Sequence, residues 1–306
     1  MKTTNRRYFL RDLGLLTAAS GLASLLPYDL LAMAKKDFFK ISLAEWSFHK
    51  ALFANEMTNL QFPVISKKEF GIDIVEYVSP FFQKKESDSS YLKELKLITD
   101  SEGVQNHLIM VDGEGQLGDL DEKARTKAIE NHYKWVDAAK FLGCKTIRVN
   151  AAGEGAADAV KAAAIDGLGR LSEYGQKNRI NVIVENHGGH SSDGKWLSAV
   201  IKGVNNSYCG TLPDFGNFRI SKDKEYDKYQ GVTDLMPYAK GVSAKTFNFD
   251  AAGNEPDIDY DRMFKIIREA KWSGIVGIEY EGSALSPKEG IMKTKLLLEK
   301  VRSKFG

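Results

Sequence analysis

From Phe39 to the C-terminal end, short apolar runs alternate with longer segments in which apolar residues recur at helical spacing. The apolar runs are rich in β-branched and aromatic residues, which is typical of strands buried on both faces. In 90–101, the apolar residues Tyr91, Leu92 and Leu95 indicate an amphipathic helix. The predicted strands are 39–47, 71–79, 104–112, 145–151, 180–186, 210–218, 241–249 and 274–282. The predicted helices end at 70 and cover 90–101, 121–142, 156–178, 196–204, 232–239, 259–270 and 286–305.

This alternation predicts a parallel sheet, and eight repeats of it predict a closed (β/α)8 TIM barrel. A chain of 306 residues is a normal length for one such barrel. An open doubly wound sheet is the alternative, and it calls for a glycine-rich phosphate loop after the first strand. The residues there, 44–47, read Ala-Glu-Trp-Ser and contain no glycine. We therefore expect one barrel domain over residues 35–306, without a linker or a second domain.

The first 34 residues have a different character. The twin arginines Arg6 and Arg7 precede an uncharged apolar stretch at 13–26, and Ala32-Met33-Ala34 fits a cleavage site. This order predicts a twin-arginine signal peptide over residues 1–34 and an exported or periplasmic protein. An amphipathic N-terminal helix is the alternative. The apolar stretch is too short to span a bilayer, so we expect no stable membrane insertion after cleavage.

The formal net charge of +2 belongs to this N-terminal segment. Removing residues 1–34 takes away four basic and two acidic residues and leaves 39 of each sign. A neutral body offers no electrostatic basis for binding nucleic acid or an anionic membrane.

Polar residues at the carboxyl ends of the predicted strands are the candidates for chemistry, because these ends meet on one face of a barrel. The strand at 180–186 shows this most clearly, since its apolar run breaks into Glu185, Asn186 and His187 before a glycine pair. Alternation along a strand places residues two apart on the same side. The other candidates are Trp46, Glu76, His107, Arg148, Asn150, Asp214, Lys245 and Glu279.

Glu185, Asp214 and Glu279 form the sharpest set. Carboxylates at one barrel mouth repel one another unless a positive group joins them. A divalent cation with oxygen ligands is a common solution. The alternative is that each carboxylate pairs separately with a lysine or arginine, or caps a helix.

Four segments together carry a resemblance to a known family: VIVENHGG (182–189), TLPDFGNF (211–218), VSAKTF (242–247) and GIVGIEYEG (274–282). They resemble the xylose-isomerase-like superfamily of sugar phosphate isomerases and epimerases, in an exported branch. The resemblance implies a Mn2+-type ion, with Mg2+, Co2+ or Zn2+ as alternatives. It implies Glu185, Asp214 and Glu279 as ligands, with the two glutamates also acting as the acid/base pair.

The seventh strand departs from that family's pattern. The family often has a histidine ligand there in an H-x-K-D motif, and this chain has Ser243 followed by Lys245. Three outcomes are open. Metal binding is weaker, with water in the fourth place; His187 or another group substitutes; or the Lys245 ammonium replaces the metal as the compensating cation.

The resemblance implies proton abstraction next to a sugar carbonyl through an enediolate, catalysed by Glu185 and Glu279. His187, Arg148, Asn150 and Lys245 would bind sugar hydroxyls or a developing oxyanion; Trp46, Glu76 and His107 are further substrate-binding candidates. The same chemistry can end in elimination or in cleavage of a keto-sugar glycoside. A nuclease with a trinuclear zinc site is disfavoured because the chain has only five histidines. A non-catalytic carbohydrate-binding barrel is the remaining alternative.

Overall fold

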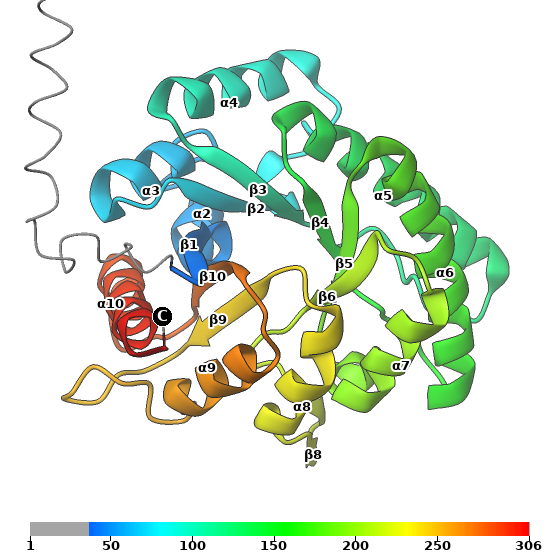
Figure 1. Cartoon of the computed structure of the whole chain (residues 1–306). Helices are drawn as coiled ribbons and strands as arrows, with labels where there is room; N and C mark the ends of the chain where they lie inside the picture. The colour runs from blue at the N-terminus through cyan, green and yellow to red at the C-terminus, as the bar shows by residue number, and fades with distance from the viewer. Residues whose placement is uncertain (1–36, 306) are drawn as a thin grey trace, which may run out of the picture. The chain divides into compact units, whose positions relative to one another are not determined.

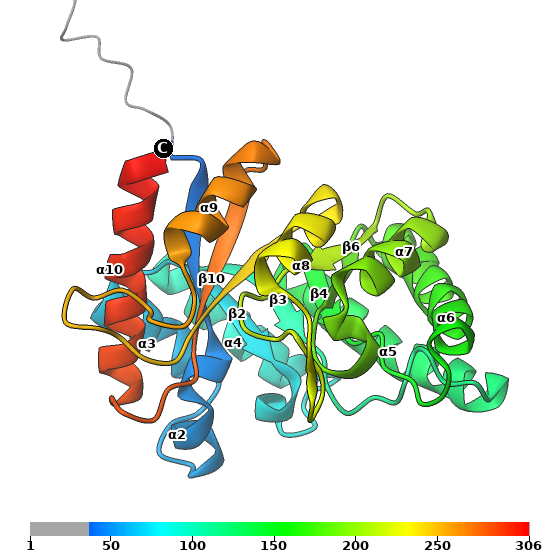
Figure 2. The same ribbon diagram turned by 90° about the horizontal axis from the view of Figure 1, so that it is seen from below.

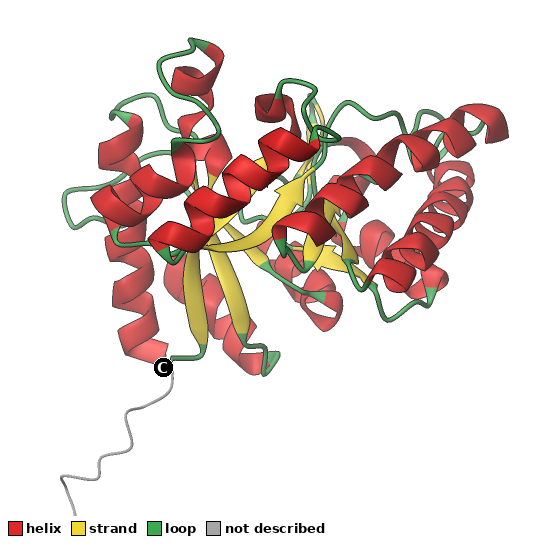
Figure 3. Cartoon of the chain, turned by 90° about the horizontal axis from the view of Figure 1, so that it is seen from above, coloured by secondary structure: helices red, strands yellow, loops and turns green. Residues whose placement is uncertain are grey.

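A computed structural model describes residues 37–305, and from Phe38 onward the chain forms one compact unit. Strands lie at the centre and helices surround them (Figures 1 and 3). The barrel strands are β1 (Phe39–Ala44), β2 (Ile74–Val78), β3 (Gln105–Met110), β4 (Thr146–Val149), β5 (Asn181–Glu185), β6 (Cys209–Leu212), β9 (Val242–Thr246) and β10 (Gly274–Tyr280). The helices are α2 (His49–Phe53), α3 (Phe62–Phe70), α4 (Ser89–Glu102), α5 (Glu122–Leu142), α6 (Ala157–Asn178), α7 (Gly194–Val204), α8 (Lys228–Leu235), α9 (Tyr260–Glu269) and α10 (Pro287–Phe305).

The strands form one eight-stranded sheet in the order β6-β5-β4-β3-β2-β1-β10-β9, and every pair is parallel. Its two edges, β6 and β9, meet through two isolated parallel bridges, Thr211 with Ala239 and Asp214 with Ser243. We call this junction the β6–β9 seam. The predicted (β/α)8 barrel is confirmed, with a closure at the seam that is weaker than a full ladder.

Glycines follow the helices α3 and α5, which end where the sequence predicted. Gly71 follows α3 and Gly143 follows α5, and both have positive φ values, 65° and 84°. Glycine has no Cβ, so it adopts this left-handed conformation without steric cost. The chain can then turn directly from helix to strand.

All the predicted strands end earlier than expected, and the strands 39–47 and 210–218 show why. β1 stops at Ala44, and a 3-10 turn, η4 (Glu45–Phe48), follows it. β6 stops at Leu212 because Pro213 has no N–H to continue the ladder. Oδ1 of Asp214 then accepts the backbone N–H groups of Gly216 and Asn217, which turns the chain across the barrel mouth.

An antiparallel hairpin of β7 (Arg219–Ser221) and β8 (Lys224–Glu225) follows this turn, and the sequence did not predict it. Its strands are short and largely exposed, so they carry no alternation of apolar and polar residues. Figure 2 places α2, which follows β1, at the lower end of the barrel and the C-terminus at the upper end. The lower end is therefore the one to which the strands' carboxyl ends point.

The core fills both the barrel interior and the layer between sheet and helices. Val182, Ile183 and Val184 of β5 are completely buried, as the apolar run predicted for a strand covered on both faces. None of the helices in the described part of the chain is long and apolar enough to cross a membrane. The predicted signal peptide lies outside the described residues.

The helix α6 offers a matched test of this packing. A Cβ on Gly167 would lie 2.0 Å from the carbonyl oxygen of Leu117, whereas a Cβ on Gly169 would meet no atom within 4 Å. We expect Gly167→Ala to lower the free energy of unfolding by about 2 kcal/mol, because the backbone must shift. Gly169→Ala should raise it by up to about 1 kcal/mol through helix propensity. Urea unfolding followed by circular dichroism measures both, and a stabilising Gly167→Ala would contradict the packing.

Candidate active site

Three carboxylates from separate strands meet at the barrel mouth. Glu185 is the last residue of β5, Asp214 follows β6, and Glu279 lies near the end of β10. One oxygen from each lies within 4.8 Å of the others, and all three side chains are buried. The set that the sequence singled out is thus brought together, at a spacing at which one divalent cation can contact all three.

Ser243 of β9 lies in this cluster. Its hydroxyl oxygen is 2.7 Å from Asp214 Oδ2 and 2.8 Å from Glu279 Oε2. A hydroxyl has only one hydrogen to donate, so both contacts are satisfied together only if one carboxyl group is itself protonated. Burial raises the pKa of Asp214 to about 7 against the opposing charge of Lys245. Asp214 is therefore the group more suited to hold that proton.

Lys245 places an ammonium group among the same carboxylates. Its Nζ lies 2.9 Å from Glu279 Oε1, 3.1 Å from Glu281 Oε1 and 3.7 Å from Asp214 Oδ2. The side chain is only 1% exposed. Burial alone would lower the pKa of Lys245, but the surrounding carboxylates raise it well above its usual value. The lysine therefore stays charged and compensates part of the negative charge, as one of the sequence-based outcomes proposed.

Arg148 of β4 compensates the other side of the cluster. Its Nη1 donates to Asp112 Oδ1 at 2.7 Å, and Asn150 Nδ2 donates to the same oxygen. Its Nε lies 2.9 Å from Glu185 Oε2, in a geometry that makes an ion pair without a hydrogen bond. Arg148 and Asn150 face the same way, as predicted, and both hold Asp112.

One oxygen of Glu185 accepts no hydrogen bond from the described residues. Oε1 accepts a hydrogen bond of 2.9 Å from Asn217 Nδ2, whereas Oε2 is buried and has no hydrogen-bond donor among the described residues. A buried carboxylate oxygen without a donor carries a desolvation cost. The Arg148 guanidinium, with Nε 2.9 Å from Oε2, offsets part of that cost as an ion pair.

The two glutamates have opposite pKa shifts. Burial raises the pKa of Glu185 to about 7, against the lowering charge of Arg148. Burial acts on Glu279 in the same direction, but Lys245 and the Ser243 hydrogen bond outweigh it and lower its pKa. Near neutral pH, Glu279 is ionised and Glu185 can hold or release a proton. Two carboxyl groups whose pKa values are shifted apart in this way are suited to general acid/base catalysis.

Glu76 of β2 is also buried, and its Oε1 accepts a hydrogen bond of 2.5 Å from the Ser42 hydroxyl. Burial raises the pKa of Glu76 to about 8, and the charges of Glu279 and Glu185 raise it further against the Ser42 bond. This carboxyl group is therefore largely neutral at pH 7. Its electrostatic coupling to both glutamates places it next to the cluster.

The remaining predicted residues occupy different places. His187 is exposed at the barrel mouth, yet partial desolvation by its surroundings together with the charge of Arg148 lowers its pKa, so its imidazole is neutral at pH 7. Trp46 stacks on His49 with ring centroids 4.8 Å apart, and its Nε1 donates to Glu281. His107 lies in the amino-terminal half of β3, where burial lowers its pKa to about 4. A substrate contact for His107 stays a prediction.

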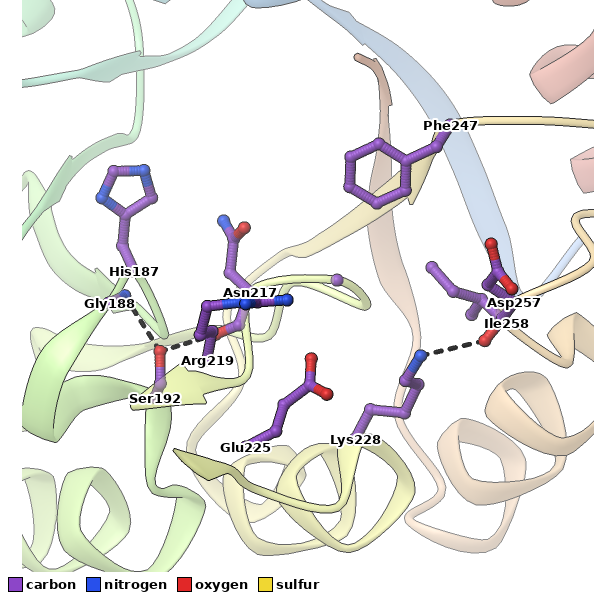
Figure 4. Close-up of a pocket in the computed structure, with 11 residues that line it drawn as sticks. His187, Gly188, Ser192, Asn217, Arg219, Glu225, Lys228, Phe247, Asp257 and Ile258 are labelled. Atoms are coloured by element: carbon purple, nitrogen blue, oxygen red, sulfur yellow. Dashed lines mark hydrogen bonds between the residues drawn. The ribbon is translucent and has the colours of Figure 1, made fainter. Parts of the chain in front are cut away.

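Beside the carboxylates lies a cavity of about 710 Å3 that the sequence did not predict (Figure 4). It is bordered by His187 and Asn217 on the barrel side. The rest of its wall comes from the segments after β5, β6 and β9, which carry no periodic pattern that sequence reasoning could use. The lining residues from those segments include Arg219, Glu225, Lys228, Phe247 and Asp257.

Glu45, the first residue of η4, allows the effect of burial on a carboxyl pKa to be tested. It is fully buried; its Oε2 accepts the Val78 N–H at 2.9 Å, and its Oε1 has no partner among the described residues. Burial raises its pKa to about 8, against the lowering effect of the Val78 bond.

Because the folded-state pKa of Glu45 exceeds the unfolded-state value, its contribution to stability is present at low pH and is lost as the pH rises towards 8. Glu45→Gln keeps an oxygen acceptor for Val78 but cannot ionise. We expect the stability of this variant relative to the wild type to rise by about 2 kcal/mol between pH 6 and pH 9. Urea unfolding at both pH values measures this, and a pH-independent difference would show that Glu45 is ionised in the folded protein.

The comparisons with known proteins agree with this architecture. A family profile described as a xylose isomerase-like TIM barrel matches residues 67–300. No curated protein matches the chain. Among solved structures, the IolI protein with a bound zinc atom is 17% identical, with a TM-score of 0.66 over 87% of this chain and 99% of that one.

Two sugar epimerases are similar at comparable distance. The 3-keto-D-glucoside 4-epimerase of E. coli is 16% identical, with a TM-score of 0.61 over 86% of this chain and 99% of that one. A D-psicose 3-epimerase crystallised in the presence of D-fructose is 12% identical, with a TM-score of 0.62 over the same shares. At these identities the likeness concerns the fold alone. The family match over residues 67–300 decides the assignment: the chain belongs to the xylose isomerase-like TIM barrel family.

Proposed function

We propose that the protein is a carbohydrate isomerase or epimerase that moves a proton next to a sugar carbonyl. The observation that carries this proposal is the pair Glu185 and Glu279, two buried carboxyl groups in one cluster whose pKa values are shifted in opposite directions. General acid/base catalysis at neutral pH requires such a pair. The two epimerases that share the fold support the same reaction class.

The donor set also fits a divalent cation, with Mn2+ as our first choice and Mg2+, Co2+ or Zn2+ as alternatives. Glu185, Asp214 and Glu279 would hold it, and the observation that favours an ion is that one oxygen from each of the three buried carboxylates lies within 4.8 Å of the others. A bound ion would polarise the sugar carbonyl and stabilise the negative charge that develops on its oxygen. Ser243 in place of a fourth strong ligand implies modest affinity.

The side chains of this chain divide the remaining work. Glu279, which is ionised, takes the proton from the carbon next to the carbonyl, and the electron pair left behind moves onto the carbonyl oxygen. Glu185 then delivers its own proton to carbon, and the face or carbon that receives it decides between epimerisation and isomerisation. The neutral imidazole of His187 would hydrogen-bond a sugar hydroxyl; we keep Lys245 as a proposed substrate contact, although its buried ammonium already meets Glu279 and Glu281.

Other residues act as supports in this proposal. Arg148 and Asn150 fix Asp112, and Arg148 also faces Glu185, so both help to set the charge on the acid. Trp46 offers an aromatic face beside Glu281, and Glu76 supplies a neutral carboxyl group next to the cluster. We keep His107 as a proposed substrate contact with no support from its position on β3.

The second candidate is a lyase or glycoside-cleaving enzyme that acts on a keto-sugar. Loss of a proton next to a ketone can be followed by departure of a group from the neighbouring carbon. The cavity of about 710 Å3 beside the carboxylates favours this candidate, because it leaves room for a leaving group. Export through the predicted signal peptide, which we also propose, would bring the enzyme to unphosphorylated glycosides.

The acid/base assignment is tested by Glu185→Gln and Glu279→Gln. Each variant keeps the side-chain shape but cannot exchange a proton, so we expect turnover to fall by roughly 10²-fold to 10⁴-fold. The measurement is a screen of free ketoses and 3-keto-glucosides in D2O with Mn2+, in which deuterium on carbon and the product are both detected by NMR. Glu130→Gln, at an exposed position on α5, is the matched control. Unchanged turnover in either active-site variant would remove that residue from the mechanism.

Metal binding is tested by Asp214→Asn, with Asp112→Asn as its matched control. The asparagine keeps the oxygen that accepts the Gly216 and Asn217 N–H groups but loses the negative charge. We expect Mn2+ affinity to fall by roughly tenfold or more in Asp214→Asn and far less in Asp112→Asn, which lies outside the three carboxylates. Electron paramagnetic resonance of free Mn2+ during titration measures both. Equal affinities in wild type and Asp214→Asn would place any bound ion elsewhere.

A further inference from the structure

The cavity adjoins the proposed reaction centre through Asn217. Asn217 lines the cavity and donates to Glu185 Oε1 at 2.9 Å, and His187 lines it from the same side. Gly216, also in the lining, lies against both Lys245 and Phe247. None of the three clustered carboxylates lines the cavity itself. A sugar ring held at the carboxylates would therefore leave this volume for a neighbouring group.

The aromatic part of the cavity wall suits a pyranose ring. Figure 4 shows the Phe247 ring directed into the space, with the His187 imidazole on the opposite side. A pyranose presents an apolar face of C–H groups, which packs on an aromatic ring. Its edges carry hydroxyl groups, which need hydrogen-bond donors and acceptors.

The polar part of the cavity wall supplies both hydrogen-bond donors and hydrogen-bond acceptors. Arg219 and Lys228 are donors, and Glu225 and Asp257 are acceptors. The two cations and the two carboxylates balance, and the Lys228 ammonium already donates to the Asp257 carbonyl oxygen at 2.9 Å. A phosphate site has an excess of positive charge. This lining favours a neutral ligand.

We propose that this cavity is a second sugar-ring subsite, so that the enzyme acts on a neutral disaccharide or glycoside rather than on a sugar phosphate. The reacting ring lies at the carboxylates, and the neighbouring ring stacks on Phe247 and hydrogen-bonds Arg219 and Glu225. This inference rests on the proposed carbohydrate function and deepens it, because it specifies the substrate class.

The test compares ligands with one ring and with two. Methyl α- and β-D-glucopyranoside are the one-ring probes, and cellobiose, maltose, trehalose and sucrose are the two-ring probes; all are titrated calorimetrically into the full-length protein. We expect at least one disaccharide to bind roughly tenfold more tightly than either methyl glucoside. If no disaccharide exceeds both methyl glucosides, the second subsite does not exist.

Variants then locate the second ring. Phe247→Leu should lower the disaccharide-to-monosaccharide affinity ratio by roughly tenfold, whereas Phe247→Tyr, which keeps the aromatic face, should retain the ratio. Arg219→Gln is a second, independent variant on the wall and should lower the ratio as well. Phe141→Leu, on α5 at an exposed position, is the matched control. If Phe247→Leu weakens both ligand classes equally, Phe247 does not contact a second ring.

Two further measurements separate this inference from the proposed function. Glucose 6-phosphate should bind no more tightly than glucose; a tenfold preference that Arg219→Gln abolishes would make the cavity a phosphate site and overturn the inference. Glu185→Gln should keep the disaccharide preference while it loses turnover. If no sugar is turned over by the wild type, the proposed function fails, yet the affinity ratio still decides the subsite.

Discussion

The balance of buried charge at the barrel mouth is the constraint on which the site depends. Glu76, Glu185, Asp214 and Glu279 are all buried near one another, and among residues 37–305 Arg148 and Lys245 bring the positive charge to them. Buried ions are costly unless they are paired. The protein meets this constraint in two ways: the two cations hold Glu279 and Asp112 ionised, and burial raises the pKa values of Glu76, Asp214 and Glu185, which favours their protonated forms.

The balance of buried charge explains how a serine can occupy its position on β9. The family that the chain resembles often has a histidine ligand at this position, whereas this chain has Ser243, which lies between Asp214 and Glu279. A hydroxyl cannot supply positive charge, but it can donate to one carboxylate while it accepts a hydrogen bond from the other carboxyl group when that group is protonated. Lys245, two residues along the same strand, brings the missing charge from the same side. Strand β9 therefore links the two carboxylates that face it through a hydrogen bond and an ammonium group together.

Much of the fold was predictable because its causes are local. Apolar runs, helical periodicity and glycines such as Gly71 and Gly143 marked nearly every barrel element, and alternation correctly paired Arg148 with Asn150. Convergence of strand ends also brought Glu185, Asp214 and Glu279 together. Contacts outside the strands had no such local pattern in the sequence to predict them. The β7–β8 hairpin is polar and short, and the contact of Asn217 with Glu185 depends on a turn that Pro213 and Asp214 create together.

The β6–β9 seam joins the barrel's closure to the charge cluster. One of its two bridges pairs Asp214 with Ser243, whereas the other barrel neighbours pair through ladders of at least two residue pairs. The two chain segments that close the barrel therefore also carry two members of the cluster, Asp214 and Ser243. Any ligand that draws Asp214 and Glu279 together across Ser243 must tighten this junction as well. Occupancy of the mouth and resistance of the barrel to opening at this edge are therefore thermodynamically linked, and each strengthens the other by the same amount.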